Sequence, residues 1–342
     1  MPTINRQVVL ARRPNGYPVP GDFRLEEAPL PAVGPGQFLL ENHYVSLDAG
    51  FRNWMNEGSG DEVLPAMALD APVMGLTLGR VAESRHPDYV VGEWLMARLC
   101  WEEYSVTDGG DFISRLPEPR DCPLSYYLGV LGDTGLSAYF GLLDIGRPAP
   151  GETVLVSAAA GAVGNVAGQL AKIHGARAVG IAGSPEKCAR LVDELGFDAA
   201  VNYREEGLQG AIAAACPDGV HVYFDSVGGP LLETVIDNLG VGARIALCGA
   251  ITAYNATEPL PGPSNLFQLT ARQALMQGFM THLQEHRYPE ARAALTGWLQ
   301  SGELKNVEYR LHGMERVGEA FCDLFAGNNF GKTVVQLRDD GE

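Results

Sequence analysis

One short stretch near the middle of the chain constrains the fold more than any other. The apolar run ETVLVSA, typical of a buried strand, leads directly into AAGAVGNVAGQLAK, typical of a helix. The turn between them, residues 159–164, has the pattern A-x-G-x-x-G. In such a turn Gly161 lets a pyrophosphate approach the backbone, Gly164 lets the helix pack on the strand, and the first helical N–H groups attract the anion. We therefore predict a dinucleotide-binding turn rather than a purely structural one.

Strands and helices alternate on both sides of this turn. Six segments have strand character, with helical stretches between them: ETVLVSA, RAVGIAG, DAAVNY, HVYFDSV, ARIALCG and ALMQGFM. Alternation of this kind predicts a parallel sheet with helices on both faces, and six strands are the number in two mononucleotide-binding halves. We predict that residues 126–306 form a doubly wound α/β Rossmann domain that binds NADP.

The first 125 residues have a different pattern. Short apolar runs are separated by Pro/Gly turns, and none keeps a helical period; the candidate strands are QVVLARRP, GQFLLENHYVSLD, LTLGRVAES and VVGEWLMARLC. This pattern predicts a β-rich domain over residues 1–125. The tail, residues 307–342, contains one helical segment and a last strand, GKTVVQL, and we expect it to complete the first domain.

Composition restricts the partners and the compartment. The net charge of −17 opposes binding to duplex DNA or to an anionic membrane, although one local basic pocket can still hold an anionic ligand. Six scattered cysteines without a C-x-x-C pair fit a reducing cytoplasm. We see no secretory signal and no stretch near the roughly 20 apolar residues of a membrane span. A cytoplasmic enzyme with a small-molecule substrate is expected.

The segment that follows the second strand of the sheet favours NADP over NAD. NAD enzymes usually carry an acid there, which holds the ribose hydroxyls. This chain has Gly183-Ser184-Pro185-Glu186-Lys187, whose small residues leave room for a 2′-phosphate. Lys187 can neutralise that phosphate and Ser184 can donate a hydrogen bond to it. Two alternatives stay open: Ser184 only caps the next helix, or Glu186 is a ribose-binding acid shifted by two residues.

Several segments, in order, are similar to the medium-chain dehydrogenase/reductase superfamily: SAAAGAVGNVAGQLAK, GSPEK, VNY, YFDSVGG, RIALCGAITAYN and GNNFGKTVV. Within it they resemble the zinc-free branch of leukotriene dehydrogenase/oxoprostaglandin reductase, alkenal double-bond reductase and curcumin reductase. The resemblance is dense from about Leu128 to the C-terminus and looser before it. It implies a GroES-like catalytic domain, a Rossmann domain, often a homodimer, and NADPH-dependent reduction of a C=C bond conjugated to a carbonyl.

The resemblance also implies where NADPH lies. The pyrophosphate would contact the glycine turn, and the 2′-phosphate would contact Lys187 and Tyr203. The nicotinamide half would lie against the loops after the last strands, and Asn329 would close the site from the tail. Ser226 stands where relatives often have Asn. The residues that this placement assigns to the cofactor are Gly161, Ala162, Val163, Gly164, Ser184, Lys187, Tyr203, Ser226, Cys248, Gly249, Ala250, Ile251, Tyr254, Phe279, Met280, Thr281 and Asn329.

The zinc ligands of the zinc-dependent relatives have no counterpart in this sequence. The region of the first ligand reads Val45-Ser46-Leu47-Asp48, and there is no Gly-His-Glu run. A zinc site needs several N, S or carboxylate ligands at tetrahedral reach. His282 and His286 can share a helix face, but no third ligand accompanies them. We predict a metal-free mechanism.

Without a metal, hydrogen-bond donors must stabilise the enolate oxygen that forms when hydride adds to the β-carbon. Tyr254, in the loop CGAITAYNATEPLPGP, is the predicted catalytic donor, either to the enolate or to the cofactor ribose. The alternative is a loop tyrosine that only packs on the cofactor.

Two departures from the family fall near the expected substrate pocket. Relatives commonly carry Asp-Pro-Tyr-Met-Arg where this chain has Asp48-Ala49-Gly50-Phe51-Arg52, and Gly-Met-x-Gly where it has Gly132-Asp133-Thr134-Gly135. We assign Gly50, Phe51 and Asp133 to the pocket and expect a larger or more polar substrate than a simple alkenal. The alternative for Asp133 is that it caps a helix beginning near Leu136.

Three other functions compete with a double-bond reductase. A quinone reductase shares the zinc-free architecture and the hydride source. A zinc-free alcohol or ketone reductase has less support, because no proton relay to an alcohol oxygen is visible. A non-catalytic NADPH-binding sensor would bind the cofactor without oxidising it.

Overall fold

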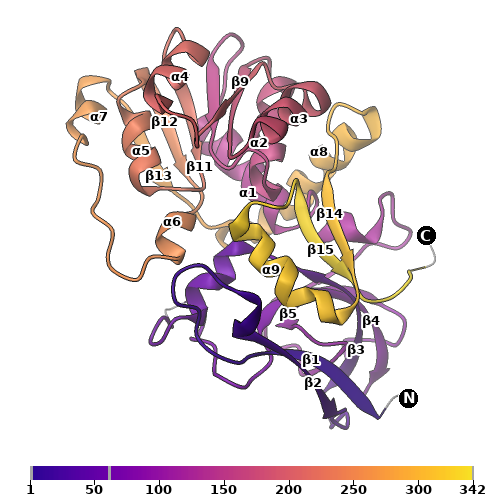
Figure 1. Cartoon of the computed structure of the whole chain (residues 1–342). Helices are drawn as coiled ribbons and strands as arrows, with labels where there is room; N and C mark the ends of the chain where they lie inside the picture. The colour runs from indigo at the N-terminus through magenta and orange to yellow at the C-terminus, as the bar shows by residue number, and fades with distance from the viewer. Residues whose placement is uncertain (1–2, 61–62, 341–342) are drawn as a thin grey trace. The chain divides into compact units, whose positions relative to one another are not determined.

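The computed structural model of the chain describes residues 3–60 and 63–340, which divide into two compact units (Figure 1). Unit 1 contains the residues up to Leu128, then Glu308–Asn328 and the residues from Thr333 onward. Unit 2 contains Gly129–Val307 and Asn329–Lys332. The C-terminal tail therefore supplies residues to both units.

Unit 2 is built on a six-stranded parallel sheet in the order β10-β9-β8-β11-β12-β13. Its strands are β8 (Thr153–Val156), β9 (Arg177–Ala182), β10 (Ala199–Asn202), β11 (Val220–Asp225), β12 (Leu239–Leu247) and β13 (Leu275–Gly278). The chain starts at β8 in the middle, runs outward to β10 and returns to β11. This is the doubly wound order of a Rossmann sheet, in which the strand order reverses between β8 and β11. The predicted fold class is confirmed.

Helices join these strands. The helical elements of unit 2 are α1 (Asp133–Phe140), η4 (Gly141–Gly146), α2 (Ala162–Ile173), α3 (Pro185–Leu195), α4 (Leu208–Ala215), α5 (Gly229–Ile236), α6 (Ile251–Tyr254), α7 (Phe267–Ala271), η5 (Thr281–Arg287) and α8 (Tyr288–Ser301). The central strands are apolar on both sides because helices cover both faces: Val154, Leu155 and Val156 of β8 are completely buried. Because the helices cover the two faces of the sheet, the loops between strands and helices meet at its carboxyl edge.

Unit 1 holds a seven-stranded sheet and a separate two-stranded one. The large sheet has the order β14-β15-β3-β4-β5-β7, with β6 pairing β3. Its strands are β3 (Phe38–Ser46), β4 (Met74–Ser84), β5 (Trp94–Cys100), β6 (Tyr104–Thr107), β7 (Ile113–Arg115), β14 (Glu308–His312) and β15 (Lys332–Gln336). The small sheet pairs β1 (Ile4–Leu10) with β2 (Phe23–Pro29). The β-rich character expected for the first part of the chain is confirmed.

The core of unit 1 depends on the C-terminal tail. The short helices of this unit are η1 (Pro20–Asp22), η2 (Ala49–Met55), η3 (Leu124–Leu128), η6 (Met314–Arg316) and α9 (Val317–Ala326). Phe321 of α9 lies edge-on to Trp101, with ring centroids 5.2 Å apart, and also contacts Phe23. Val335 of β15 pairs with Val45 of β3. Among the described residues, no helix is both long and apolar enough to cross a bilayer.

Candidate functional site

The glycine turn after β8 leaves a helix N-terminus open to a ligand. Helix α2 begins at Ala162 with Gly161 as its N-cap, and no side chain of the described residues caps it. Ala158 adopts the left-handed conformation (φ 46°) that reverses the chain here. A Cβ on Gly164 would lie 2.5 Å from the carbonyl oxygen of Ala158 and 2.8 Å from the Cα of Ala159. Any side chain at Gly164 would thus push α2 away from β8, so the turn fits a pyrophosphate on free N–H groups.

The tail segment of unit 2 lies directly against this turn. The backbone N–H of Gly331 donates to the carbonyl of Ala160 (2.8 Å), and Gly331 forms a parallel bridge with Gly161. Asn329 is buried, and its amide donates to the carbonyl oxygen of Gly331 (3.2 Å). The structure therefore places Asn329 beside the glycine turn, although about 165 residues separate them in the chain. Its contact with a cofactor stays a prediction.

The turn after β9 combines a capped helix with a half-buried ammonium. The Ser184 hydroxyl accepts a hydrogen bond from the backbone N–H of Lys187 (3.2 Å), and Pro185 opens helix α3. Ser184 is therefore a helix cap, but the cap uses the backbone of Lys187 and leaves its side chain available. Glu186 points to solvent from the same helical turn.

Two arginines that the sequence analysis did not single out lie near Lys187. Burial lowers the pKa of Lys187, and the charges of Arg204 and Arg190 lower it further. The Arg204 guanidinium lies 5.6 Å from the centre of the Tyr203 ring, and that of Arg190 lies 3.8 Å from the centre of the Phe330 ring. Three cations therefore gather at this turn in a chain with a net charge of −17, with Arg190 also paired to Glu194, and the binding of an anion by this cluster stays a prediction.

A buried carboxylate shapes the turn after β11. Asp225 accepts hydrogen bonds from the backbone N–H groups of Val227 (2.9 Å) and Gly228 (3.1 Å) and from the hydroxyl of Ser157 (3.1 Å). These bonds fix the turn that presents Ser226. The Ser226 hydroxyl is buried beside the Cys248 thiol, and no hydrogen bond of good geometry to the described residues satisfies it. An unsatisfied buried hydroxyl at this edge fits a ligand contact.

The loop after β12 folds back on itself through Tyr254. Cys248, Gly249 and Ala250 lead into α6, whose last residue is Tyr254. The Tyr254 hydroxyl accepts a hydrogen bond from the backbone N–H of Ala250 (3.2 Å). Burial raises the pKa of Tyr254 above its ordinary value of 10. The phenol is therefore protonated at neutral pH and keeps its own proton for donation.

The side chains of the residues after β13 point in different directions, some into the interior of unit 2 and some toward the carboxyl edge of its sheet. The Phe279 ring packs on Phe224 and over Gly141, where an added Cβ would lie 2.5 Å from it. Phe279 therefore points into the unit. Met280 is 44% exposed, and the Thr281 hydroxyl donates to the carboxylate of Asp133 (2.5 Å).

Asp133 has a different role from the helix cap that we considered. Helix α1 begins at Asp133 itself, three residues before the expected start, and Gly132 is its N-cap. Asp133 is thus the first residue of the helix and not its N-cap, and its side chain accepts a hydrogen bond from the Thr281 hydroxyl. The capping alternative is wrong because the helix starts too early for it.

Gly50 and Phe51 belong to unit 1, on η2. A Cβ built on Gly50 meets no atom within 4 Å, so this position borders open space. Phe51 packs on Trp54, with ring centroids 6.1 Å apart. Their assignment to a substrate pocket stays a prediction.

Within residues 3–60 and 63–340, no three His, Cys, Asp or Glu side chains are close enough together to hold a metal ion. His282 and His286 both lie on η5, which Gln284 interrupts with non-helical backbone angles. The metal-free mechanism stays a prediction.

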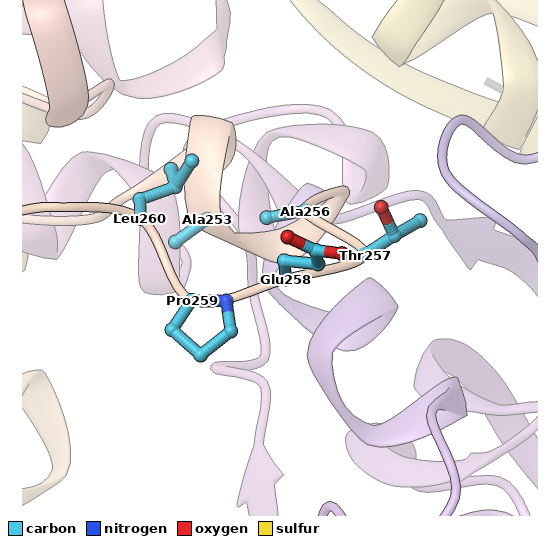
Figure 2. A pocket seen from close by; sticks show the side chains of 6 residues that line it. All are labelled: Ala253, Ala256, Thr257, Glu258, Pro259 and Leu260. Atoms are coloured by element: carbon cyan, nitrogen blue, oxygen red, sulfur yellow. The ribbon is translucent and has the colours of Figure 1, made fainter.

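A shallow hollow of about 310 Å³ lies on the loop that follows α6 (Figure 2). Its lining residues are Ala253, Ala256, Thr257, Glu258, Pro259 and Leu260. They come from the predicted Tyr254 loop, and Figure 2 shows the Glu258 carboxylate and the Thr257 hydroxyl as its polar groups.

Comparison with known proteins agrees with this geometry. Residues 6–114 match the family model described as the N-terminal domain of oxidoreductase, and residues 162–297 match the one described as zinc-binding dehydrogenase. The chain is 39% identical to the NADPH-dependent curcumin reductase of Escherichia coli (strain K12), over 98% of each chain. It is 37% identical to the NADP(+)-dependent 2-alkenal reductase of Nicotiana tabacum, over 97% of each.

A solved structure is similar over its whole length as well. The crystal structure of CurA from Vibrio vulnificus in complex with NADPH superimposes with a TM-score of 0.91 at 39% identity, covering 98% of this chain and 99% of that one. The chain belongs to the medium-chain dehydrogenase/reductase superfamily, in the branch of the alkenal, curcumin and oxoprostaglandin reductases.

Proposed function

We propose that this chain uses NADPH to reduce the C=C bond of α,β-unsaturated carbonyl compounds, without a metal. As a member of its family it is an NADP-dependent oxidoreductase of the class that acts on conjugated C=C bonds. The observation that carries the proposal is the carboxyl edge of the unit 2 sheet. There an open helix N-terminus follows β8, a cluster of three cations follows β9 and β10, and a protonated tyrosine follows β12.

The order of these residues along the sheet matches the order of the chemical groups along NADPH. The N–H groups at the start of α2 would bind the pyrophosphate, and Lys187 with Arg204 would bind the 2′-phosphate. Bound NADPH supplies a hydride for the β-carbon of the substrate. Tyr254 would donate its proton in a hydrogen bond to the carbonyl oxygen, which gains negative charge in the transition state. The α-carbon then takes up a proton to complete the reduction.

The function is tested by following NADPH oxidation with a panel of enals, enones, curcumin-like dienones and quinones. We expect selective consumption with the conjugated carbonyl compounds. Faster turnover of the quinones would favour a quinone reductase instead. Tight NADPH binding without turnover of any compound would favour a sensor. As a control for the metal-free mechanism, a chelator should leave the rate unchanged, whereas stoichiometric zinc in the purified protein would contradict it.

We also propose that two copies of the chain form a homodimer through β13. This strand ends the six-stranded sheet, so its outer edge has no neighbouring strand among the described residues. Large apolar side chains are exposed on β13, on its neighbour β12 and in the segments just before and after β13 in the chain: Val241, Leu266, Phe267, Leu275 and Leu283. Soluble proteins normally cover or charge such an edge, and pairing with a second copy would bury it.

Replacing both Leu275 and Phe267 by lysine should therefore convert the dimer to a monomer, because lysine opposes pairing at an exposed edge. Analytical ultracentrifugation measures the change. The matched control replaces Val192 of α3 and Val91 of unit 1, two exposed apolar residues on other elements, by lysine and should remain dimeric. A monomeric wild-type protein would contradict the proposal.

The compartment that we propose is the cytoplasm. All six cysteines, Cys100, Cys122, Cys188, Cys216, Cys248 and Cys322, are free thiols in the structure. A reducing compartment keeps thiols in this state.

A further inference from the structure

The two ends of the cofactor-binding edge differ in charge. In a doubly wound sheet a dinucleotide crosses the carboxyl edge at the point where the strand order reverses, here between β8 and β11. The cations Lys187, Arg190 and Arg204 mark the phosphate-bearing end, beyond β9. The opposite, reacting end therefore lies over the loops after β11, β12 and β13.

A carboxylate stands at that reacting end. Asp133 accepts the hydroxyl of Thr281, which follows β13, at 2.5 Å. Asp133 also lies near Cys248, which follows β12: burial, with the Asp133 charge as the next cause, raises the pKa of Cys248 to about 12. The same two causes raise the pKa of Tyr288 to about 12. The Thr281 hydroxyl fixes the position of the carboxylate but does not neutralise it.

This carboxylate acts on the two sides of a conjugated double bond differently. The carbonyl oxygen gains negative charge during reduction, so it is favoured at a donor such as Tyr254 and disfavoured near Asp133. The substituent on the other side of the double bond would then be the group that faces Asp133. A second negative charge there would be repelled, whereas a hydroxyl, phenol or ammonium group could donate a hydrogen bond.

We propose that Asp133 selects substrates by charge, which rests on the double-bond reductase function proposed above. The preferred class is the α,β-unsaturated carbonyl compounds whose far substituent is neutral or donates hydrogen bonds. Compounds with a carboxylate at that position are excluded.

The test compares two substrates that share one skeleton: 4-oxopent-2-enoate and its methyl ester. The ester-to-acid ratio of kcat/KM is measured in wild type and in Asp133→Asn, so that the intrinsic reactivity of each compound cancels. We expect the ratio to fall about fivefold in the variant, because Asp133 is exposed and two like unit charges about 4 Å apart in water repel by about 1 kcal/mol. Asp133→Met removes the charge by a second route and should lower the ratio equally.

Two control variants separate charge from other effects. Asp193→Asn makes the same change in net charge at an exposed site on α3 and should keep the wild-type ratio. Thr281→Val removes the hydrogen bond but keeps the carboxylate, so the ratio should stay near that of wild type whatever happens to the absolute rate. NADPH binding, measured by fluorescence titration, shows that each variant is folded.

The outcomes of the test separate charge selection by Asp133 from the double-bond reductase function on which it rests. If wild type reduces the ester and the ratio does not change in Asp133→Asn and Asp133→Met, Asp133 does not select by charge and the proposed function stands. If wild type oxidises NADPH with neither the ester nor any other conjugated carbonyl compound, the proposed function itself is wrong.

Discussion

The Lys187→Ala variant should bind NADPH tenfold to a hundredfold more weakly than wild type and bind NADH about equally well. Only NADPH carries the 2′-phosphate, and a hydrogen bond between charged groups contributes about 1.5–3 kcal/mol. Lys187 is half-buried, so solvent screens its charge less than that of a surface lysine. The measurement is the dissociation constant of each reduced cofactor, obtained by fluorescence titration.

Lys172→Ala is the matched control, because Lys172 lies on the same unit but pairs with Asp198. It should leave both constants unchanged. Equal weakening of NADPH and NADH in Lys187→Ala would contradict the phosphate assignment and would favour the alternative in which Glu186 binds the ribose.

The pH dependence of NADPH binding gives a second check. The pKa of Lys187 is lowered, so the NADPH preference should hold while the ammonium is charged and fall as pH rises through that lowered value.

The Tyr254→Phe variant should lose tenfold to a hundredfold in kcat on an enone. The lost hydrogen bond to a developing negative charge corresponds to about 1.5–3 kcal/mol. The dissociation constant of NADPH should change little, since the ring remains to pack. Single-turnover kinetics with NADPH and one enone measure the hydride-transfer step directly. Because burial raises the pKa of Tyr254, loss of its proton should not reduce the wild-type rate below about pH 10.

Tyr17→Phe removes a hydroxyl from an exposed tyrosine of unit 1 and should behave as wild type. An unchanged turnover in Tyr254→Phe would remove the catalytic role and leave the packing alternative. The Ala250 N–H, which donates to the Tyr254 hydroxyl, loses its acceptor in the variant. Thermal unfolding of the variant therefore shows whether a loss in rate reflects a disordered loop.

Local pattern was enough to predict the sheet of unit 2. Its six strands are short apolar runs between helices, and Gly164 packs against Ala158 and Ala159 as the turn motif predicted. The strand β2 was not among the candidates because its sequence, FRLEEAP, is mostly polar and half-exposed. It forms a strand because it pairs with β1 along its whole length, which is a tertiary effect.

The site was predicted less completely for the same reason. Lys187 came from the segment after the second strand and Tyr203 from the resemblance, but Arg204 became visible only when folding brought it toward Lys187. Arg190 lies three residues after Lys187, the spacing of neighbours on one helix face, and this was the one local signal for it. The bond between Thr281 and Asp133 joins residues 148 positions apart, and no local pattern encodes it.

The pairing of β15 with β3 affects folding during translation as well as the stability of the folded protein. During synthesis β3 leaves the ribosome long before the residues that pair with it around Val335. The main segment of unit 2, Gly129–Val307, is complete before then. The part of β3 from Tyr44 to Ser46 therefore lacks its β15 partner until then, whereas β6 can pair earlier with Phe38–Glu41. An open strand edge recruits other chains. The emergence of β15 thus closes this strand edge and ends the risk of aggregation that the open edge creates.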